Sequence, residues 1–281
     1  MDGFFLVNKH IGMTSHDVVS MLKHKFKLDK VGHTGTLDPF ASGLLIVCVG
    51  KATKLSFLLA DANKSYEGTI VFGKHYDTYD VTGQVIHEKE VKLQENSVRQ
   101  VVETFIGGYD QEPPMHSAIK IDGQKLYHLA RQGKTVNRPK RAVMIHQFHI
   151  RSFRAQSLAF DVHVSKGTYI RSLAVDIASA LGTYGALSTL RRTAIGTYQL
   201  KDAKTIDDIT TDDLITLEDY FKDYPKVVLN DYMTNLVKHG IILDERQTTI
   251  HKPFVVHNEH GQFIAYYEPV DEHQYKPVLI R

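Results

Sequence analysis

The chain has 281 residues, of which 42% are hydrophobic and 23% charged, a composition that supports a sizeable core and excludes a disordered chain. Its single cysteine, Cys48, cannot form an intrachain disulfide, and no run approaches the ~20 consecutive apolar residues of a membrane span. The formal net charge is only +2, so the total charge does not by itself indicate a polyanionic partner. No basic region precedes the short apolar run at the N-terminus, so we expect no signal peptide and a cytoplasmic location.

The first half of the chain predicts alternating short strands and helices. Residues 4–7 predict a strand, and Thr14 with Asp17 three residues later predicts a capping box that opens a helix. A glycine-rich loop over 32–43 precedes a buried strand at 44–49 and a short helix at 51–60. Further on, the predicted elements are a half-buried strand over 66–74 and an amphipathic helix over 98–106 that stops at two glycines.

A distinctive basic stretch, residues 110–141, follows and contains an Asp122–Gly123 turn signal, so we expect an insertion that projects from the sheet. Strands are predicted at 142–151 and 158–165, a helix at 170–181, and strands again at 186–192 and 197–200. Strands and helices do not alternate regularly. The predicted fold is therefore α+β, with a mixed, mostly antiparallel sheet flanked by helices.

The last eighty residues change character twice. The acidic segment 201–223 is expected to be a helical boundary region, and after Pro225 the chain predicts short strands separated by turn residues. We therefore expect two domains, residues 1–224 and a small β-rich, barrel-like module at 225–281. The strands expected in this module are 227–229, 240–243, 254–256, 263–267 and 277–280.

Charge is distributed unevenly along the chain. Residues 115–171 contain eleven lysines and arginines but only two acids, whereas residues 201–223 contain eight acids and three lysines. Such asymmetry is typical of a surface that docks on phosphates, although two ordinary solvated faces would give the same count.

Several familiar motifs are missing. The stretch from Gly43 to Lys51 lacks the spacing and the Ser or Thr of a phosphate-binding loop, and it predicts a core strand instead. The sixteen histidines form no zinc pattern, so no metal is expected. No Gly-x-Ser-x-Gly elbow occurs.

The loop over residues 32–43 is the strongest candidate for chemistry. It surrounds Asp38 with glycines, and Pro39 restricts the backbone directly after that carboxylate. Functional groups often lie on such loops when a rigid scaffold holds them. From the local sequence alone, however, the plainer interpretation is favoured: Asp38 caps a turn, as the aspartate of an Asp-Pro pair often does.

The loop sequence Gly-His-Thr-Gly-Thr-Leu-Asp-Pro-Phe-Ala-Ser-Gly closely resembles the signature of the TruB family of tRNA pseudouridine synthases. Four further segments resemble motifs of that family in the correct order, and the resemblance extends from Phe5 to about Gly196, more weakly beyond. These segments are Lys-Ser-Tyr at 64–66, Asp-Thr-Tyr-Asp at 77–80, Ser-Lys-Gly-Thr-Tyr-Ile-Arg at 165–171 and Leu-Arg-Arg at 190–192. In one departure, His10 follows Lys9 where the family usually has proline, and the C-terminal part resembles a PUA-type RNA-binding domain only loosely.

The resemblance implies a pseudouridine synthase fold and an enzyme that isomerises uridine 55 in the T loop of tRNA. It implies that Asp38 is the nucleophile, that Arg171 pairs with it, and that Tyr66 stacks on the target uracil. Leu190 would pack against the same base and His33 would contact the opened RNA loop. Supporting or substrate-binding positions would be Lys9, Lys64 and Asp80.

Elementary chemistry agrees with these roles. Pseudouridine formation replaces a C–N bond by a C–C bond without redox change, so no cofactor is expected. It does need a nucleophile, and an arginine can keep a partly buried carboxylate ionised. Each residue also has a plainer interpretation: Tyr66 and Leu190 as core side chains, and Arg171 as a solvated helix residue.

The main alternative is a non-catalytic RNA-binding protein on the same scaffold, and another is a synthase with a different uridine target. The set Asp38, Tyr66 and Arg171 favours the enzyme, because a pure binder has no need of the carboxylate. We expect a monomer that binds the T arm and loop of tRNA, with no membrane contact and no obligatory protein partner.

Overall fold

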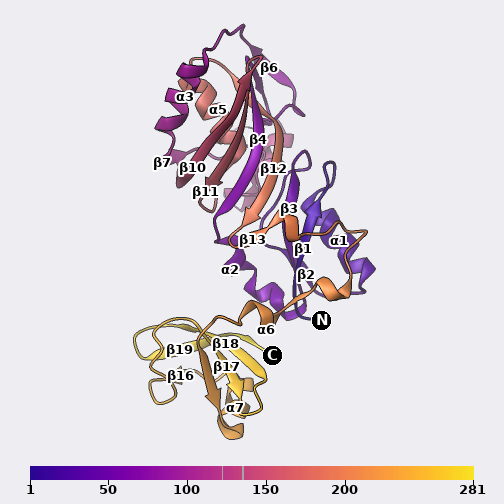
Figure 1. Ribbon diagram of the computed structural model, residues 1–281, viewed down its shortest axis with the longest axis vertical. Helices are drawn as coiled ribbons and strands as arrows, with labels where there is room; N and C mark the ends of the chain where they lie inside the picture. Colours follow the sequence, from indigo (N-terminus) through magenta and orange to yellow (C-terminus); the bar gives the residue numbers. More distant parts are fainter. Residues whose placement is uncertain (122, 135) are drawn as a thin grey trace.

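The computed structural model describes residues 1–121, 123–134 and 136–281. The molecule is elongated, with a small C-terminal lobe at one end of a larger body (Figure 1). In this described part of the chain, no helix has the length and apolar character needed to cross a membrane. Asp122, the first residue of the expected Asp-Gly turn, lies outside the described residues.

Ten strands form the sheet of the larger body, and paired strands run antiparallel except where β3 meets β12. This confirms the predicted α+β fold with a mixed, mostly antiparallel sheet. In spatial order the strands are β14 (Ile215–Thr216), β1 (Gly3–Lys9), β3 (Ser42–Val49), β12 (Gly185–Ile195), β4 (Lys64–Phe72), β11 (Ser157–Val164), β10 (Arg141–Arg154) and β7 (Gly107–Gln111). Off this path, β2 (Val31–His33) pairs with β3 and β13 (Tyr198–Gln199) with β12.

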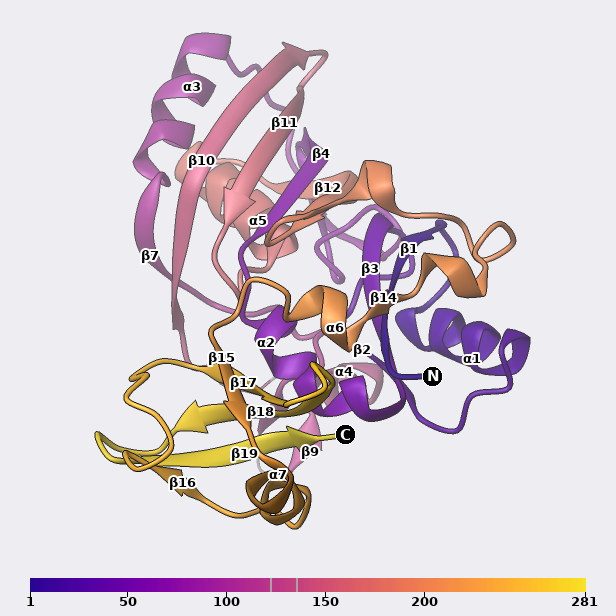
Figure 2. The same ribbon diagram turned by 60° about the horizontal axis from the view of Figure 1, so that its bottom comes forward.

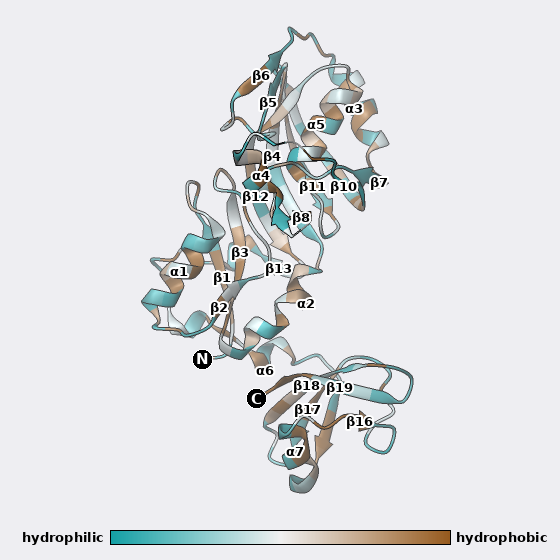
Figure 3. Cartoon of the chain, turned by 180° about the vertical axis from the view of Figure 1, so that it is seen from behind, coloured by the Kyte–Doolittle hydropathy of each residue, from teal (hydrophilic) through white to brown (hydrophobic). Residues whose placement is uncertain are grey.

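Helices cover one face of the sheet in the half formed by β4, β7, β10, β11 and β12, and both faces in the half formed by β1 and β3. Helices α3 (Glu95–Thr104) and α5 (Ile170–Ala180) lie together beside β7, β10 and β11 and come forward when the molecule is seen from behind (Figure 3). Apolar side chains of α3, α5 and strands β4, β10, β11 and β12 form one buried cluster. In the other half, α1 (Ser15–Lys25) packs on β1 and β3.

The predicted start of α1 is confirmed. The Asp17 N–H donates to Thr14 Oγ1 at 3.0 Å and the Thr14 N–H donates to Asp17 Oδ2 at 2.8 Å, which is the expected capping box. The expected stop of α3 differs slightly, because the helix already ends at Thr104 and Gly107 opens strand β7 instead. A 3-10 helix (Gly50–Leu55) and α2 (Ser56–Ala60) replace the single short helix expected over 51–60.

The two halves of the sheet meet at a short parallel contact between β3 and β12, where Ser42 pairs with Arg191 and Gly43 with Arg192. Gly43 has φ +105°, and a Cβ there would lie 2.3 Å from the carbonyl oxygen of Arg192. Only glycine permits this approach. The loop that carries Asp38 ends directly before β3, so this contact fixes the loop at the junction of the two halves.

Two smaller elements project from the body. One is the hairpin of β5 (Lys74–Tyr76) and β6 (Val85–Glu88). The other is the basic insertion, which contains β8 (Lys120–Ile121), β9 (Gln124–Lys125) and α4 (Leu126–Arg131). Leu126 and Leu129 of α4 are buried, whereas Lys120 and Lys134 are exposed. The insertion is therefore folded around a few apolar anchors while its lysines face solvent.

The prediction that residues 201–223 are helical is wrong for most of the segment. It contains two 3-10 turns, Leu200–Asp202 and Thr211–Asp213, the two-residue strand β14 and the four-residue helix α6 (Leu217–Tyr220). Threonine and aspartate three residues apart bond to each other at 205 and 208, 210 and 213, and 216 and 219. These local bonds close single turns and compete with a continuous helix.

The C-terminal lobe is β-rich, as predicted. Its sheet has the order β15 (Lys226–Leu229), β17 (Phe254–Asn258), β18 (Phe263–Pro269), β19 (Gln274–Ile280) and β16 (Leu243–Asp244). Two details differ from the expectation: residues 240–242 are not a strand, and helix α7 (Asp231–Lys238) was not predicted.

The lobe packs on the body through an aromatic contact below α6 (Figure 2). Phe221 stacks on Phe263 and Tyr266, with ring centroids 5.5 and 4.7 Å apart, and all three belong to a buried cluster that also includes residues of β1 and β3. The domain boundary expected at 224/225 falls between α6 and β15.

Candidate active site

The backbone of the loop between β2 and β3 is anchored on both sides of Asp38. Leu37 and Ala41 are buried in the same apolar cluster as α5. The Leu37 N–H donates to Ser15 Oγ at 2.8 Å, and the Gly12 N–H donates to the Pro39 carbonyl oxygen at 2.7 Å. The Asp38 side chain keeps 33% of its surface exposed, so an anchored backbone presents one accessible carboxylate.

Two buried cations tie the loop to its surroundings. The Lys9 ammonium donates to the carbonyl oxygens of His10, Met13 and Ala41 at 3.0, 2.8 and 2.6 Å. Burial lowers the pKa of Lys9 to about 8, although the Asp38 carboxylate acts in the opposite direction. Lys9 is therefore held by main-chain carbonyl oxygens of the Asp38 loop and of the segment after β1, one of them that of the neighbouring His10.

Arg192 is the second buried cation, and it is only 2% exposed. Its Nε donates to the carbonyl oxygen of Leu44 at 2.7 Å, and an Nη donates to that of Gly35 at 3.2 Å. A guanidinium offers a fixed fork of donors, so this side chain joins β12, the start of β3 and the Asp38 loop. No role for Arg192 beyond the Leu-Arg-Arg match could be predicted, because burial of an arginine depends on carbonyl partners that are distant in sequence.

Asp38 and Arg171 form a two-point ion pair across the junction. Arg171 Nε lies 2.8 Å from Asp38 Oδ2, and an Nη donates to Asp38 Oδ1 at 3.1 Å. Arg171 itself is almost fully buried, and its remaining donors bond to the carbonyl oxygens of Thr78 and His116, both at 2.8 Å. Such bidentate pairing fixes the orientation of the carboxylate.

Asp80 supports this pair from the opposite side. Its carboxylate is buried, lies 3.9 Å from an Nη of Arg171 and accepts a hydrogen bond from the Thr82 N–H at 3.0 Å. The main chain of Asp80 also forms an isolated parallel β-bridge with Leu187 of β12. Arg171 is thus enclosed by two carboxylates and two carbonyls, which explains how its charge is accommodated while buried.

Tyr66 and Leu190 lie on one face of the sheet, next to the loop. In the pairing of β4 with β12, Leu190 is opposite Gly68 and Arg192 is opposite Tyr66, and such partners share a face. Leu190 is buried and Tyr66 is half-buried, and both belong to the apolar cluster that includes Leu37. An aromatic ring and an apolar side chain therefore share one cluster with the loop residue that directly precedes Asp38.

His33 and Lys64 have other surroundings. His33 ends β2, its Nδ1 is buried without a hydrogen-bond partner among the described residues, and burial lowers its pKa. The Lys64 ammonium donates to the carbonyl oxygens of Ala60 and Ala62, at the end of α2, and burial lowers its pKa to about 8. The predicted contacts of both residues with RNA stay predictions.

Tyr169 is a further side chain of the site that sequence reasoning left without a role. It directly precedes α5, and burial raises the pKa of its hydroxyl. The nearby Arg171 lowers this pKa, whereas the nearby Asp38 raises it. Its place within the motif at 165–171 was a signal that could have identified it. In the described part of the chain, no three histidine, cysteine or carboxylate side chains gather as metal ligands.

The arrangement suits nucleophilic catalysis by a carboxylate. Asp38 is fixed on one side by Arg171 and partly exposed to solvent, and the loop residues Leu37 and Ala41 share an apolar cluster with Tyr66 and Leu190. A planar base could pack against these side chains while the carboxylate attacks it or its sugar.

Two family models together match most of the chain. A model described as "TruB family pseudouridylate synthase (N terminal domain)" matches residues 23–170, and one described as "tRNA pseudouridylate synthase B C-terminal domain" matches residues 171–233. Curated proteins named "tRNA pseudouridine synthase B" are also similar over nearly the whole length. The protein of Aster yellows witches'-broom phytoplasma is 54% identical over 279 residues, covering 99% of each chain. That of Acholeplasma laidlawii is 52% identical over 276 residues, covering 98% of each.

A solved structure shares the fold at lower identity. A chain in "Crystal Structure of a Cbf5-Nop10-Gar1 Complex" superimposes with a TM-score of 0.73 and is 24% identical, covering 99% of this chain and 84% of that one. This likeness supports the fold assignment alone.

Proposed function

The chain belongs to the TruB family of pseudouridylate synthases, and from that premise we propose that it converts uridine 55 in the T loop of tRNA to pseudouridine, with Asp38 as nucleophile on a flipped-out base. The relatives named above are tRNA pseudouridine synthases, which supports tRNA as the substrate. The observation that carries the residue assignment is the bidentate contact of Asp38 with the buried Arg171.

The reaction requires the uracil to leave the base stack. Flipping costs a few kcal/mol, and stacking on an aromatic ring returns about 1–3 kcal/mol. Tyr66 is the proposed stacking partner and Leu190 the wall on the other side, because both lie on the sheet face that adjoins the Asp38 loop. The neighbouring apolar cluster would also limit access of water to the detached base.

In covalent catalysis by Asp38, the bonds broken and formed balance without a cofactor or a second substrate. The carboxylate forms a temporary bond to the nucleotide, at C6 of the base or C1′ of the sugar, and this bond is broken again before the product leaves. The C1′–N1 bond is broken, the C1′–C5 bond is made, C5 loses a proton and N1 gains one. Arg171 orients the carboxylate for the first step.

The basic insertion is proposed to hold the RNA by its phosphates. The insertion has a hollow of about 420 Å³ that is lined by Lys120, Lys125 and His128, among others. Arg171 donates to the carbonyl oxygen of His116 in the same insertion, so the RNA-binding element directly adjoins the catalytic pair. That residues 225–281 form a PUA-like RNA-binding domain, and that the enzyme is a cytoplasmic monomer, stay predictions.

One experiment tests this function. Purified protein is incubated with an unmodified tRNA transcript, and pseudouridine is mapped at each uridine for wild type, Asp38→Asn and the exposed control Asp29→Asn. We expect product at position 55 with wild type and Asp29→Asn and none with Asp38→Asn, because the amide is a poor nucleophile.

The other outcomes separate the alternatives. Equal product with Asp38→Asn would refute the nucleophile assignment. Product at another uridine would keep the nucleophile but change the target, and binding without product from any variant would favour the non-catalytic RNA-binding protein.

A further inference from the structure

Helix α5, which carries Arg171, begins without a side-chain cap of its own. Tyr169 is the N-cap residue, and its side chain makes no capping hydrogen bond. The first N–H groups of a helix need partners from elsewhere in such a case. Arg171 is the second residue of the helix, so whatever fixes this first turn also fixes the direction of the guanidinium.

The missing contact comes from the buried side chain of Gln111, the last residue of β7. Gln111 is 2% exposed. Its Oε1 accepts from the Tyr169 N–H at 2.7 Å, and its Nε2 donates to the Tyr169 carbonyl oxygen at 3.1 Å. One carboxamide therefore binds both main-chain groups of the residue that starts the helix.

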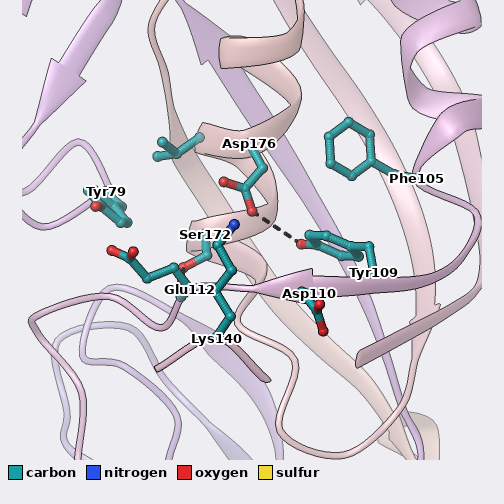
Figure 4. Close-up of a pocket in the computed structure, with 9 residues that line it drawn as sticks. Tyr79, Phe105, Tyr109, Asp110, Glu112, Lys140, Ser172 and Asp176 are labelled. Atoms are coloured by element: carbon teal, nitrogen blue, oxygen red, sulfur yellow. Dashed lines mark hydrogen bonds between the residues drawn. The ribbon is translucent and has the colours of Figure 1, made fainter. Parts of the chain in front are cut away.

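A second connection leads from the same amide to the middle of α5. Gln111 Nε2 also donates to the Tyr109 hydroxyl, which donates to Asp176 Oδ2 at 3.3 Å. Figure 4 shows the Asp176 carboxylate pointing at the Tyr109 hydroxyl, and both residues line a pocket of about 300 Å³. Gln111 thus holds α5 at Tyr169 directly and at Asp176 through Tyr109.

The residues after Gln111 join the basic insertion to the same helix. The Ser172 hydroxyl donates to the Glu112 carbonyl oxygen at 2.7 Å, and Arg138 donates to that of Pro113 at 3.0 Å. The end of β7 is therefore the point where the RNA-binding insertion and the helix of Arg171 are fixed to each other.

From these contacts we infer that Gln111 is a positioning residue, which orients Arg171, and through it Asp38, relative to the basic insertion. This inference rests on the proposed function, because it assigns Gln111 an effect on the step in which Asp38 reacts. Gln111 does not contact Asp38 and acts only through the first turn of α5.

The test compares Gln111→Glu and Gln111→Ala with wild type in two measurements, the single-turnover rate of pseudouridine formation and the Kd for tRNA. Gln111→Glu has nearly the same shape but replaces the donor that faces the Tyr169 carbonyl by an acceptor. Since small misplacements of reacting groups are costly, we expect a rate roughly 10- to 100-fold lower, with little change in Kd. A merely structural role would lower the melting temperature without this division between rate and affinity.

Gln156→Ala is the matched control. Gln156 Oε1 accepts from the Leu93 N–H at 3.0 Å, so the variant also loses a contact between a side chain and the main chain, but one that does not involve α5. We expect this variant to keep the wild-type rate.

The inference is overturned if folded Gln111 variants keep the wild-type rate while Asp38→Asn is inactive. If wild type itself is inactive, or Asp38→Asn is active, the proposed function fails instead. Should neither of these two Gln111 variants fold, Gln111→Met decides, since it has a similar length but neither the acceptor nor the donor that binds Tyr169: a reduced rate at unchanged Kd supports the inference, and a wild-type rate overturns it.

Discussion

The Asp38 loop and the basic insertion contribute to one site but are built in opposite ways. The loop, residues 34–41, is fixed by two almost fully buried cations, Lys9 and Arg192, and leaves one carboxylate accessible. The insertion, residues 110–141, is anchored by the buried Leu126 and Leu129 and by main-chain contacts of Glu112 and His116, and it leaves Lys120, Lys134 and Lys140 exposed. Pre-organisation matters most for the groups that react, whereas binding to flexible RNA needs accessible charges.

This contrast divides the expected effects of substitutions. Changes beneath the loop should alter the rate of the chemical step or the stability of the fold, and changes on the insertion should alter affinity for tRNA. A loop variant that altered only the affinity for tRNA, or an insertion variant that lowered the rate of the chemical step, would contradict this assignment.

The largest effect is expected for Arg171→Met. The substitution leaves the Asp38 carboxylate without its two-point partner and removes the donors to Thr78 and His116. We expect the single-turnover rate to fall roughly 10²- to 10³-fold, the usual loss when a group that holds active-site charge is removed. Arg171→Lys keeps the positive charge but lacks the paired N–H donors of the guanidinium, so it should recover part of the rate that Arg171→Met loses. A wild-type rate in Arg171→Met would contradict the proposed role.

Arg192→Met should act mainly on stability. The carbonyl oxygens of Gly35 and Leu44 lose their donor, which we expect to cost about 1–3 kcal/mol in the free energy of unfolding. Arg191→Met is the matched control, because Arg191 is half-exposed and pairs with Glu67 at 3.6 Å, a contact worth about 0–1 kcal/mol. Denaturant unfolding measures both, and equal losses would show that Arg192 does not hold the loop.

These two neighbouring arginines also show how far the sequence could predict the site. Tyr66 and the cap formed by Thr14 and Asp17 follow local patterns, and the structure has both elements as expected. Nothing local distinguishes Arg192 from Arg191, since the burial of Arg192 depends on carbonyl oxygens of residues 35 and 44. The contact of Gln111 with Tyr169, 58 residues away, was unpredictable for the same reason.

The helix expected in the acidic segment, residues 201–223, shows where a local pattern misleads. The composition of this segment suggested a helix, but the Thr-x-x-Asp pairs at 205–208, 210–213 and 216–219 bond within single turns. The same type of pair at Thr14 and Asp17 opens a true helix, because residues Val18, Val19 and Leu22 then pack on the sheet. The capping signal is thus local, whereas the length of the helix that follows depends on whether an apolar face can be buried.

On the insertion, the combined substitution of Lys120, Lys125 and Lys134 by glutamine should weaken tRNA binding and leave the rate at saturating enzyme unchanged. Each lost phosphate contact lowers the dependence of log Kd on log salt by about one, so the slope should fall by up to about three. The same change at Lys23, Lys27 and Lys30, exposed residues on and after α1, is the control. An unchanged slope in the insertion variant would refute the docking role.

The smallest effect is expected at Asp176, on the side of α5 that faces the pocket. Burial raises its pKa to about 6 from the usual 3.8, with Glu112 acting in the same direction and Lys140 against it. The folded protein therefore binds more protons than the unfolded chain between about pH 4 and pH 6, and stability falls as pH rises through that window. Asp176→Asn still accepts a hydrogen bond from Tyr109 but cannot ionise, so it should raise the melting temperature by roughly 1–3 °C at about pH 7.5. The gain should shrink towards pH 5, because the wild-type carboxyl is then largely protonated too, and a gain independent of pH would mean that ionisation of Asp176 is not its cause.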